Sequence, residues 1–191
     1  MKRLRKRQIS LLLSVLALGV LLLGQHFGWF ETAIDKAEQT QPGLYGIARF
    51  IDGDTIAVHM NGRQETVRMI GIDTPETHKP DTPVQCYGSA AAAFTKNLIG
   101  TQEVRLQADA KSQNRDRYDR LLRYVYLPDG RLVQKELISG GYGFAYTQFP
   151  FTKSDEFVAA EGSAKQAGKG LWSNCTVTAE SNGRKQTNTA Q

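Results

Sequence analysis

The first 30 residues contain no acidic side chain, and this absence accounts for the positive charge of the whole chain. The formal net charge is +5, but five lysine and arginine residues lie within the first seven positions. From Glu31 onward the chain carries 19 basic and 19 acidic residues, so this part is neutral. Neutrality excludes a global positive field as the means of binding a polyanion. Binding to nucleic acid would instead require local clusters of charge.

Histidine and cysteine are also scarce, with three and two residues respectively. His59 and His78 do not have the spacing of a metal-ligand pair on a helix, so we assign neither a role. The even number of cysteines predicts a disulfide between Cys86 and Cys175 if the domain lies outside the cytoplasm. Two buried free thiols are the alternative. No internal repeat is present.

The amino-terminal segment predicts export. Residues 9–23 are almost wholly apolar and follow a basic start, which is typical of a secretion signal or a signal anchor. Aromatic residues up to Phe30 extend the run to about 20 residues, enough to span a bilayer. No Ala-x-Ala-like cleavage site follows directly, so we favour an uncleaved anchor over residues 1–30. The rest of a single-pass cell-membrane protein would then be extracytoplasmic. The alternative is a secreted or periplasmic protein after signal cleavage.

Composition divides the remaining chain into three parts. Residues 31–43 are polar, end in Pro-Gly and predict a linker. Residues 44–175 hold the periodic apolar segments and predict one globular domain. Residues 176–191 lack large apolar side chains after Val177, so we expect a disordered tail.

The globular part predicts an α+β, mostly β, fold. Asn61-Gly62 between two strand-like segments is a strong hairpin signal. The expected strands cover residues 44–51, 55–60, 63–72, 102–108 and 121–127, and the expected helices cover residues 87–99, 132–139 and 154–167. Five short strands interspersed with helices favour a five-stranded Greek-key barrel of the OB type with three helices packed on it.

Two acidic turns follow predicted strands, at residues 52–55 and 73–76. Calcium prefers carboxylate and carbonyl oxygens. Asp54, Asp73 and the carbonyl of Thr74 would form an open calcium site that leaves room for water and a phosphate. Either turn alone is ordinary turn chemistry. Both together favour a functional site.

Other residue types in these segments suit phosphodiester cleavage. Glu76 lies beside the proposed ligands and is a candidate to position or deprotonate an attacking water. Arg68 and Arg120, each on or near a strand, are candidates to bind phosphate oxygens. Tyr118 and Tyr146 are candidate contacts for a nucleotide. Each alone is also compatible with a surface arginine or with a core or rim aromatic residue.

These motifs together resemble the staphylococcal nuclease (thermonuclease) family. The resemblance covers about residues 44–175 and preserves the order and similar spacing of the family's motifs. It rests on Ile51-Asp-Gly-Asp-Thr55, Arg68-Met-Ile-Gly-Ile-Asp-Thr-Pro-Glu-Thr77, Tyr87-Gly88, Asp116-Arg-Tyr-Asp-Arg120 and Gly170-Leu-Trp172. It implies an OB-type barrel and calcium-dependent hydrolysis of DNA and RNA to 3′-phosphate products. The cysteines and the apolar amino terminus are similar to those of exported members.

The resemblance also implies roles for individual residues. Three residues, Asp54, Asp73 and Thr74, match the calcium ligands. Glu76 matches the proposed general base, and Arg68 and Arg120 match the phosphate-binding arginines. Tyr118 and Tyr146 fall near residues that contact the nucleotide.

Two positions depart from the family pattern. Asp119 stands where the family often has glycine, and its charge beside Arg120 is expected to weaken phosphate binding. Gln148 stands where a second substrate-contacting tyrosine is expected. Neither change removes a core catalytic group.

The leading hypothesis is therefore a membrane-anchored, calcium-dependent nuclease, with DNA and RNA as substrates. We expect a monomer with no obligate protein partner. The alternative is a catalytically weak OB-type nucleic-acid-binding module, against which the retained carboxylates and arginines argue.

Overall fold

The computed structural model describes residues 14–15, 18–20, 43–77 and 83–190. The chain divides into two units, residues 1–40 and 41–191, and every element named below belongs to the second. The predicted anchor and linker fall almost wholly outside the described residues and stay predictions. Within the described residues, no helix is long and apolar enough to span a bilayer.

The main sheet has six strands in the order β1-β6-β7-β4-β3-β2. Their bounds are Leu44–Tyr45 (β1), Ile47–Asp52 (β2), Thr55–Met60 (β3), Arg63–Met69 (β4), Val104–Gln107 (β6) and Leu121–Tyr126 (β7). The pairing of β4 with β7 is parallel, and the other pairings are antiparallel. The two edge strands, β1 and β2, are separated in the chain only by Gly46. The sheet therefore curls into a half-barrel whose opposite edges come from one continuous segment, consistent with the predicted OB-type class.

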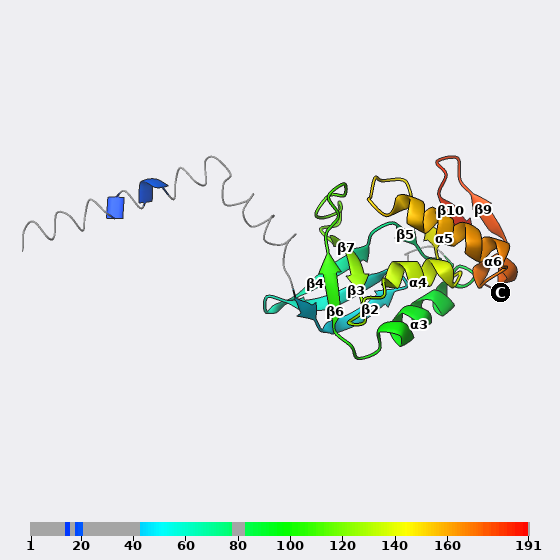
Figure 1. Cartoon of the computed structure of the whole chain (residues 1–191), viewed down its shortest axis with the longest axis horizontal. Coiled ribbons are helices and arrows are strands. Elements are labelled where there is room, and N and C mark those ends of the chain that lie inside the picture. The colour runs from blue at the N-terminus through cyan, green and yellow to red at the C-terminus, as the bar shows by residue number, and fades with distance from the viewer. Residues whose placement is uncertain (1–13, 16–17, 21–42, 78–82, 191) are drawn as a thin grey trace, which may run out of the picture. The chain divides into compact units, whose positions relative to one another are not determined.

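Two small sheets and four helices complete the fold (Figure 1). The small sheets pair β5 (Ile72–Asp73) with β8 (Phe144–Ala145), and β9 (Val177–Ala179) with β10 (Lys185–Thr187). The helices are α3 (Gly88–Ile99), α4 (Val133–Ser139), α5 (Ser154–Gln166) and the four-residue α6 (Leu171–Asn174). The three longer helices lie at the positions that the sequence predicted. Helix α6 and strand β8 were not predicted, because four and two residues are too few for a periodic signal.

The predicted strand over residues 63–72 is divided at Gly71. This residue has a φ of +74°, a conformation that L side chains rarely adopt. A Cβ at this position would also lie 2.6 Å from the ring of Phe151. The chain turns here, so β4 stays in the main sheet while β5 pairs with β8. This turn carries Asp73 away from the barrel strands and is one reason why the strand count differs from the predicted five.

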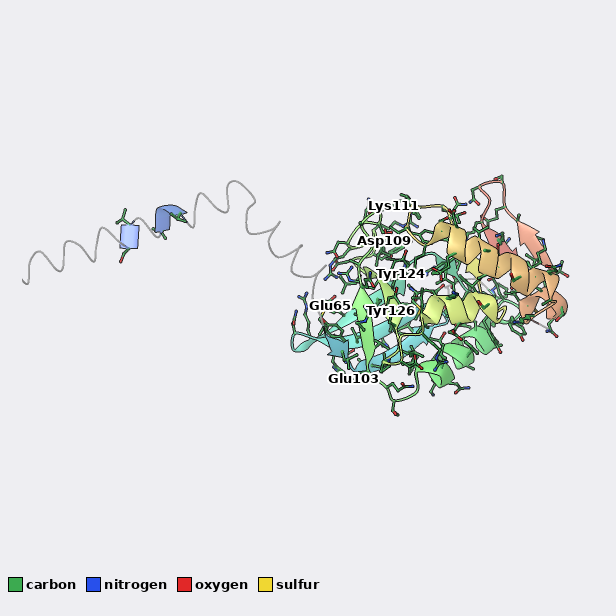
Figure 2. All side chains as sticks on the ribbon, viewed as in Figure 1. Glu65, Glu103, Asp109, Lys111, Tyr124 and Tyr126 are labelled. Atoms are coloured by element: carbon green, nitrogen blue, oxygen red, sulfur yellow. A yellow bond between two sulfur atoms is a disulfide. The ribbon has the colours of Figure 1, made fainter. Side chains whose placement is uncertain are left out.

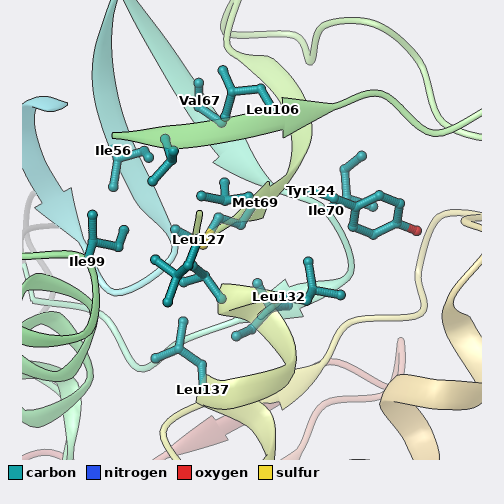
Figure 3. Packing of buried hydrophobic residues seen from close by; sticks show 14 of the residues in the cluster. Ile56, Val67, Met69, Ile70, Ile99, Leu106, Tyr124, Leu127, Leu132 and Leu137 are labelled. Atoms are coloured by element: carbon teal, nitrogen blue, oxygen red, sulfur yellow. The ribbon is translucent and has the colours of Figure 1, made fainter. Parts of the chain in front are cut away.

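The hydrophobic core lies between the strands of the main sheet and the helices packed on it (Figure 3). Along β4, Val67 and Met69 are fully buried and alternate with the partly exposed Arg68. Leu137 of α4 packs into the same cluster. Because neighbouring strand residues point to opposite faces, burial of Val67 and Met69 directs Arg68 to the other face.

The expectation of a disordered tail after residue 175 is wrong. Strands β9 and β10 form an antiparallel hairpin in this segment. The predicted disulfide between Cys86 and Cys175 is present and fixes the base of the hairpin. The hydroxyl of Thr187 donates to the Cys86 carbonyl at 2.8 Å. The disulfide and these hydrogen bonds therefore order a segment that lacks large apolar residues. The prediction of disorder rested on that lack.

A buried carboxylate, Asp109, anchors the long loop after β6 (Figure 2). Its Oδ2 accepts a hydrogen bond from the Tyr124 hydroxyl at 2.6 Å and from the Thr152 amide at 2.8 Å. The Thr152 hydroxyl donates to the same oxygen, and the Lys111 amide donates to Oδ1 at 2.7 Å. Burial alone would raise the pKa of Asp109, but these hydrogen bonds hold it below its ordinary value.

We expect Asp109→Asn to lower the free energy of unfolding by about 2–3 kcal/mol, because an amide accepts on one atom only and leaves buried donors without a partner. The folded-state pKa is depressed, so the carboxylate's contribution is complete above the ordinary aspartate pKa of about 3.9 and is lost as pH falls through the folded-state value. Urea unfolding at neutral and acidic pH measures this difference. Asp129→Asn, at an exposed turn aspartate, is the control. Equal stability of native protein and Asp109→Asn at neutral pH would contradict the assignment.

Candidate active site

The two acidic turns meet, although they lie about 20 positions apart in sequence. Asp54 follows β2, and its Oδ2 accepts hydrogen bonds from the amide and the hydroxyl of Thr74, at 3.0 and 3.1 Å. Helix α3 also stabilises the turn, because the Thr95 hydroxyl donates to the Gly53 carbonyl at 2.6 Å. A Cβ on Gly53 would lie 2.8 Å from the Thr74 hydroxyl oxygen, so a larger residue here would force Thr74 to move.

Arg68 joins the carboxylates of both turns. Its Nη2 lies 3.1 Å from Asp54 Oδ2 and 3.2 Å from Asp73 Oδ1. Its Nη1 donates to the carbonyls of Met69 and Ile72, both at 2.8 Å. The side chain is 13% exposed. Four acceptors therefore fix one guanidinium group between two buried aspartates.

Negative charge is crowded around this point. Burial raises the pKa of Asp73 above its ordinary value; Arg68 opposes this rise and Asp54 adds to it. Burial also raises the pKa of Glu76, and three neighbouring aspartates, Asp52, Asp54 and Asp73, raise it further. Carboxylates crowded together in this way favour a cation between them.

Arg120 belongs to a separate cluster on the loop before β7. Its Nε and Nη2 both lie 2.7 Å from Asp116 Oδ2. The described residues show no contact between Arg120 and the Asp54–Asp73 carboxylates. The parallel pairing of Arg68 with Leu122 nevertheless sets β4, which carries Arg68, beside β7, which begins directly after Arg120.

The departure from the family pattern at Asp119 has a local explanation. Asp119 has a φ of +62°, a conformation that glycine adopts readily and that aspartate tolerates better than most residues. Its exposed carboxylate lies 3.6 Å from Arg115 Nε. The carboxylate that binds the Arg120 guanidinium is that of Asp116, whereas Asp119 pairs with Arg115.

The comparisons with known proteins agree with this geometry. The family model for staphylococcal nuclease homologues matches residues 66–174. The chain is 38% identical over 176 residues to a thermonuclease of Staphylococcus hyicus, covering 91% of this chain and 100% of that protein. This chain belongs to the staphylococcal nuclease homologue family.

Two further relatives of the family match over shorter regions. Endonuclease YncB of Bacillus subtilis is 45% identical over 127 residues, which is 65% of this chain and 59% of that protein. A thermonuclease of Staphylococcus intermedius is 53% identical over 85 residues, which is 44% of this chain and 49% of that protein. The names of these relatives support a nuclease activity for this family member.

The oxygen donors of the site suit a hard cation with some coordination positions left for other ligands. No cluster of three or more aspartate, glutamate, histidine or cysteine side chains is arranged to hold a metal within the described ranges. The oxygen donors that the sequence predicts as ligands are the carboxylates of Asp54 and Asp73, which lie on either side of Arg68, and the Thr74 carbonyl. Such a set fits calcium if water and a substrate phosphate complete the six to eight oxygens it takes.

The predicted nucleotide contacts lie on two different segments. Tyr118 is 64% exposed. The guanidinium carbon of Arg117, Cζ, lies over the Tyr118 ring, 4.8 Å from the ring centroid. Tyr146 follows β8, and its amide donates to the Gly71 carbonyl beside β5. Gln148, where a tyrosine was expected, donates from Nε2 to the Asn182 carbonyl at 2.5 Å. This position therefore holds the β9–β10 hairpin.

One residue of the site, Arg184, was missed by sequence reasoning. Its Nε donates to Asp73 Oδ2 at 2.9 Å, and its Nη2 lies 3.7 Å from Glu76 Oε1. It was missed because the tail was interpreted as disordered. Asn182-Gly183, flanked by segments that contain threonine and valine, is a hairpin signal that predicts this placement.

Proposed function

We propose that this family member is a calcium-dependent phosphodiesterase that hydrolyses DNA and RNA and leaves 3′-phosphate products. The observation that carries the proposal is that one arginine, Arg68, joins two buried aspartates 3.1 and 3.2 Å away. Glu76 lies within the same cluster of mutually interacting carboxylates. A site of this composition combines oxygen ligands, a base and a phosphate-binding cation.

Each residue has a distinct task in this proposal. Asp54, Asp73 and the Thr74 carbonyl would hold calcium, which supplies positive charge beside the phosphate oxygens. Glu76 accepts a proton from the water whose oxygen bonds to phosphorus. The bond from phosphorus to the 5′ oxygen breaks, and that oxygen takes a proton from solvent water and leaves as a hydroxyl.

The cationic groups act on the phosphate. Arg68 and Arg120 donate hydrogen bonds to its oxygens, where negative charge increases in the transition state. Asp116 orients Arg120 by binding its Nε and Nη2. Tyr118 and Tyr146 are proposed to contact the nucleotide, by stacking or through their hydroxyl groups.

Calcium removal tests the function directly. We expect the purified protein to cleave plasmid DNA and single-stranded RNA in calcium, to stop when a chelator is added and to resume when excess calcium is restored. Product ends that lose phosphate on treatment with a 3′-phosphatase would support the proposed bond cleavage. Cleavage that persists in chelator would contradict calcium dependence. Retention of nucleic acid without cleavage in any metal would favour the binding-module alternative.

A further inference from the structure

Both oxygens of the Asp73 carboxylate are occupied by arginine side chains. Oδ1 lies 3.2 Å from Arg68 Nη2, and Oδ2 accepts from Arg184 Nε at 2.9 Å. The two arginines differ in their other partners. Arg68 also donates to two backbone carbonyls. The guanidinium of Arg184 faces carboxylates, those of Asp73 and Glu76.

The hairpin that carries Arg184 is fixed to the body of the domain. Next along the chain, Lys185 Nζ lies 2.6 Å from Glu161 Oε2 on α5. Glu161 Oε1 accepts from the amide of Ala145 on β8, the strand that pairs with β5 and hence with Asp73. Arg184 is therefore placed at the site through the same elements that place Asp73.

A divalent cation bound to Asp73 would lie close to the positive charge of Arg184, which binds the same carboxylate. Two positive groups bound to one carboxylate repel each other, and partial burial strengthens this repulsion because water screens it less. Arg184 is 31% exposed, against 13% for Arg68, so it has open space into which to withdraw. Its bond to Asp73 is therefore the contact that cation binding would break.

We propose that Arg184 is a tethered competitor of the metal: it neutralises Asp73 when calcium is absent and must leave this carboxylate when calcium binds. The inference rests on the proposed function, since calcium is the ion with which Arg184 competes. It assigns to the β9–β10 hairpin the task of setting the calcium concentration at which the site fills.

The test is a calorimetric titration of the full-length protein with calcium, without substrate. We expect Arg184→Gln to bind calcium about tenfold more tightly than the native protein, because the competing charge is gone. Arg184→Lys retains the charge and should stay close to native. Arg131→Gln is the matched control, because it makes the same charge change at an exposed arginine paired with Asp129. Its affinity should equal the native value.

Thermal unfolding gives a second measurement that also shows whether each variant folds. Calcium should raise the midpoint of Arg184→Gln more than that of the native protein, because tighter binding to the folded state stabilises it more. Equal or weaker calcium binding by folded Arg184→Gln, with native binding intact, would overturn the competition and leave the calcium site standing. Absence of calcium binding in native protein and variants alike would overturn the calcium site itself, and the competition with it.

Discussion

Replacing Glu76 with glutamine is expected to lower kcat by about 10²- to 10⁴-fold at saturating calcium, the usual contribution of a general base. Glutamine preserves the shape of the side chain but cannot take a proton from water. The amide of Glu76 is bound by the Gln85 side chain at 2.9 Å, and this backbone contact does not depend on the substituted carboxylate. Initial rates of cleavage of a short oligonucleotide measure the change.

Glu103→Gln is the control for this substitution, since Glu103 is exposed and precedes β6 (Figure 2). It should leave kcat unchanged. The thermal midpoint of Glu76→Gln should stay close to the native value. A loss of activity can then be attributed to catalysis rather than to unfolding. If Glu76→Gln retained the native kcat, another group would have to be the base.

Replacing Arg120 with alanine is expected to lower kcat/KM by about 10²- to 10³-fold, the effect of removing one donor to charge that develops in the transition state. Calcium affinity should stay native, because the guanidinium of Arg120 is bound to Asp116 rather than to the proposed calcium ligands. The two measurements together separate a phosphate contact from a metal-site defect. Steady-state kinetics and calcium titration on the same preparation provide them.

Arg131→Ala provides the comparison for Arg120→Ala. Arg131 Nε lies 2.8 Å from Asp129 Oδ2, a pairing chemically similar to that of Arg120 with Asp116. Its loss should change kcat/KM by less than about twofold, as expected of an exposed pair. Native kinetics in Arg120→Ala, or an equal loss in both variants, would refute the proposed role of Arg120.

The parts of the fold that the sequence predicted are those with a local signal. Alternation predicted β3 and β4, and the Asn61-Gly62 hairpin between them sets their register. Convergence of Asp54 with the loop after β5 follows from the short β2-β3-β4 connections. The family motifs predicted the site residues through similarity, and their catalytic roles stay predictions that the variants above test.

The parts that were missed depend on contacts between distant segments. Arg184 and Asp73 are separated by more than 100 positions, and no periodicity in the sequence links them. Order in the tail comes from a disulfide and hydrogen bonds rather than from apolar burial, so hydropathy was the wrong criterion there. Glutamine at position 148, where tyrosine was expected, is explained by its hydrogen bond to the β9–β10 hairpin, which the sequence did not predict.

Helix α3 acts as a rigid spacer between two parts of the site. Cys86, bonded to the base of the β9–β10 hairpin, lies just before its first residue, Gly88, and Thr95 holds the Asp54 turn through the Gly53 carbonyl. A helix advances about 1.5 Å per residue, so the helical stretch from Gly88 to Thr95 contributes about 10 Å of nearly fixed length between these two attachments. The separation between the proposed calcium-binding turn and the segment that carries Arg184 is therefore set partly by the length of one helix.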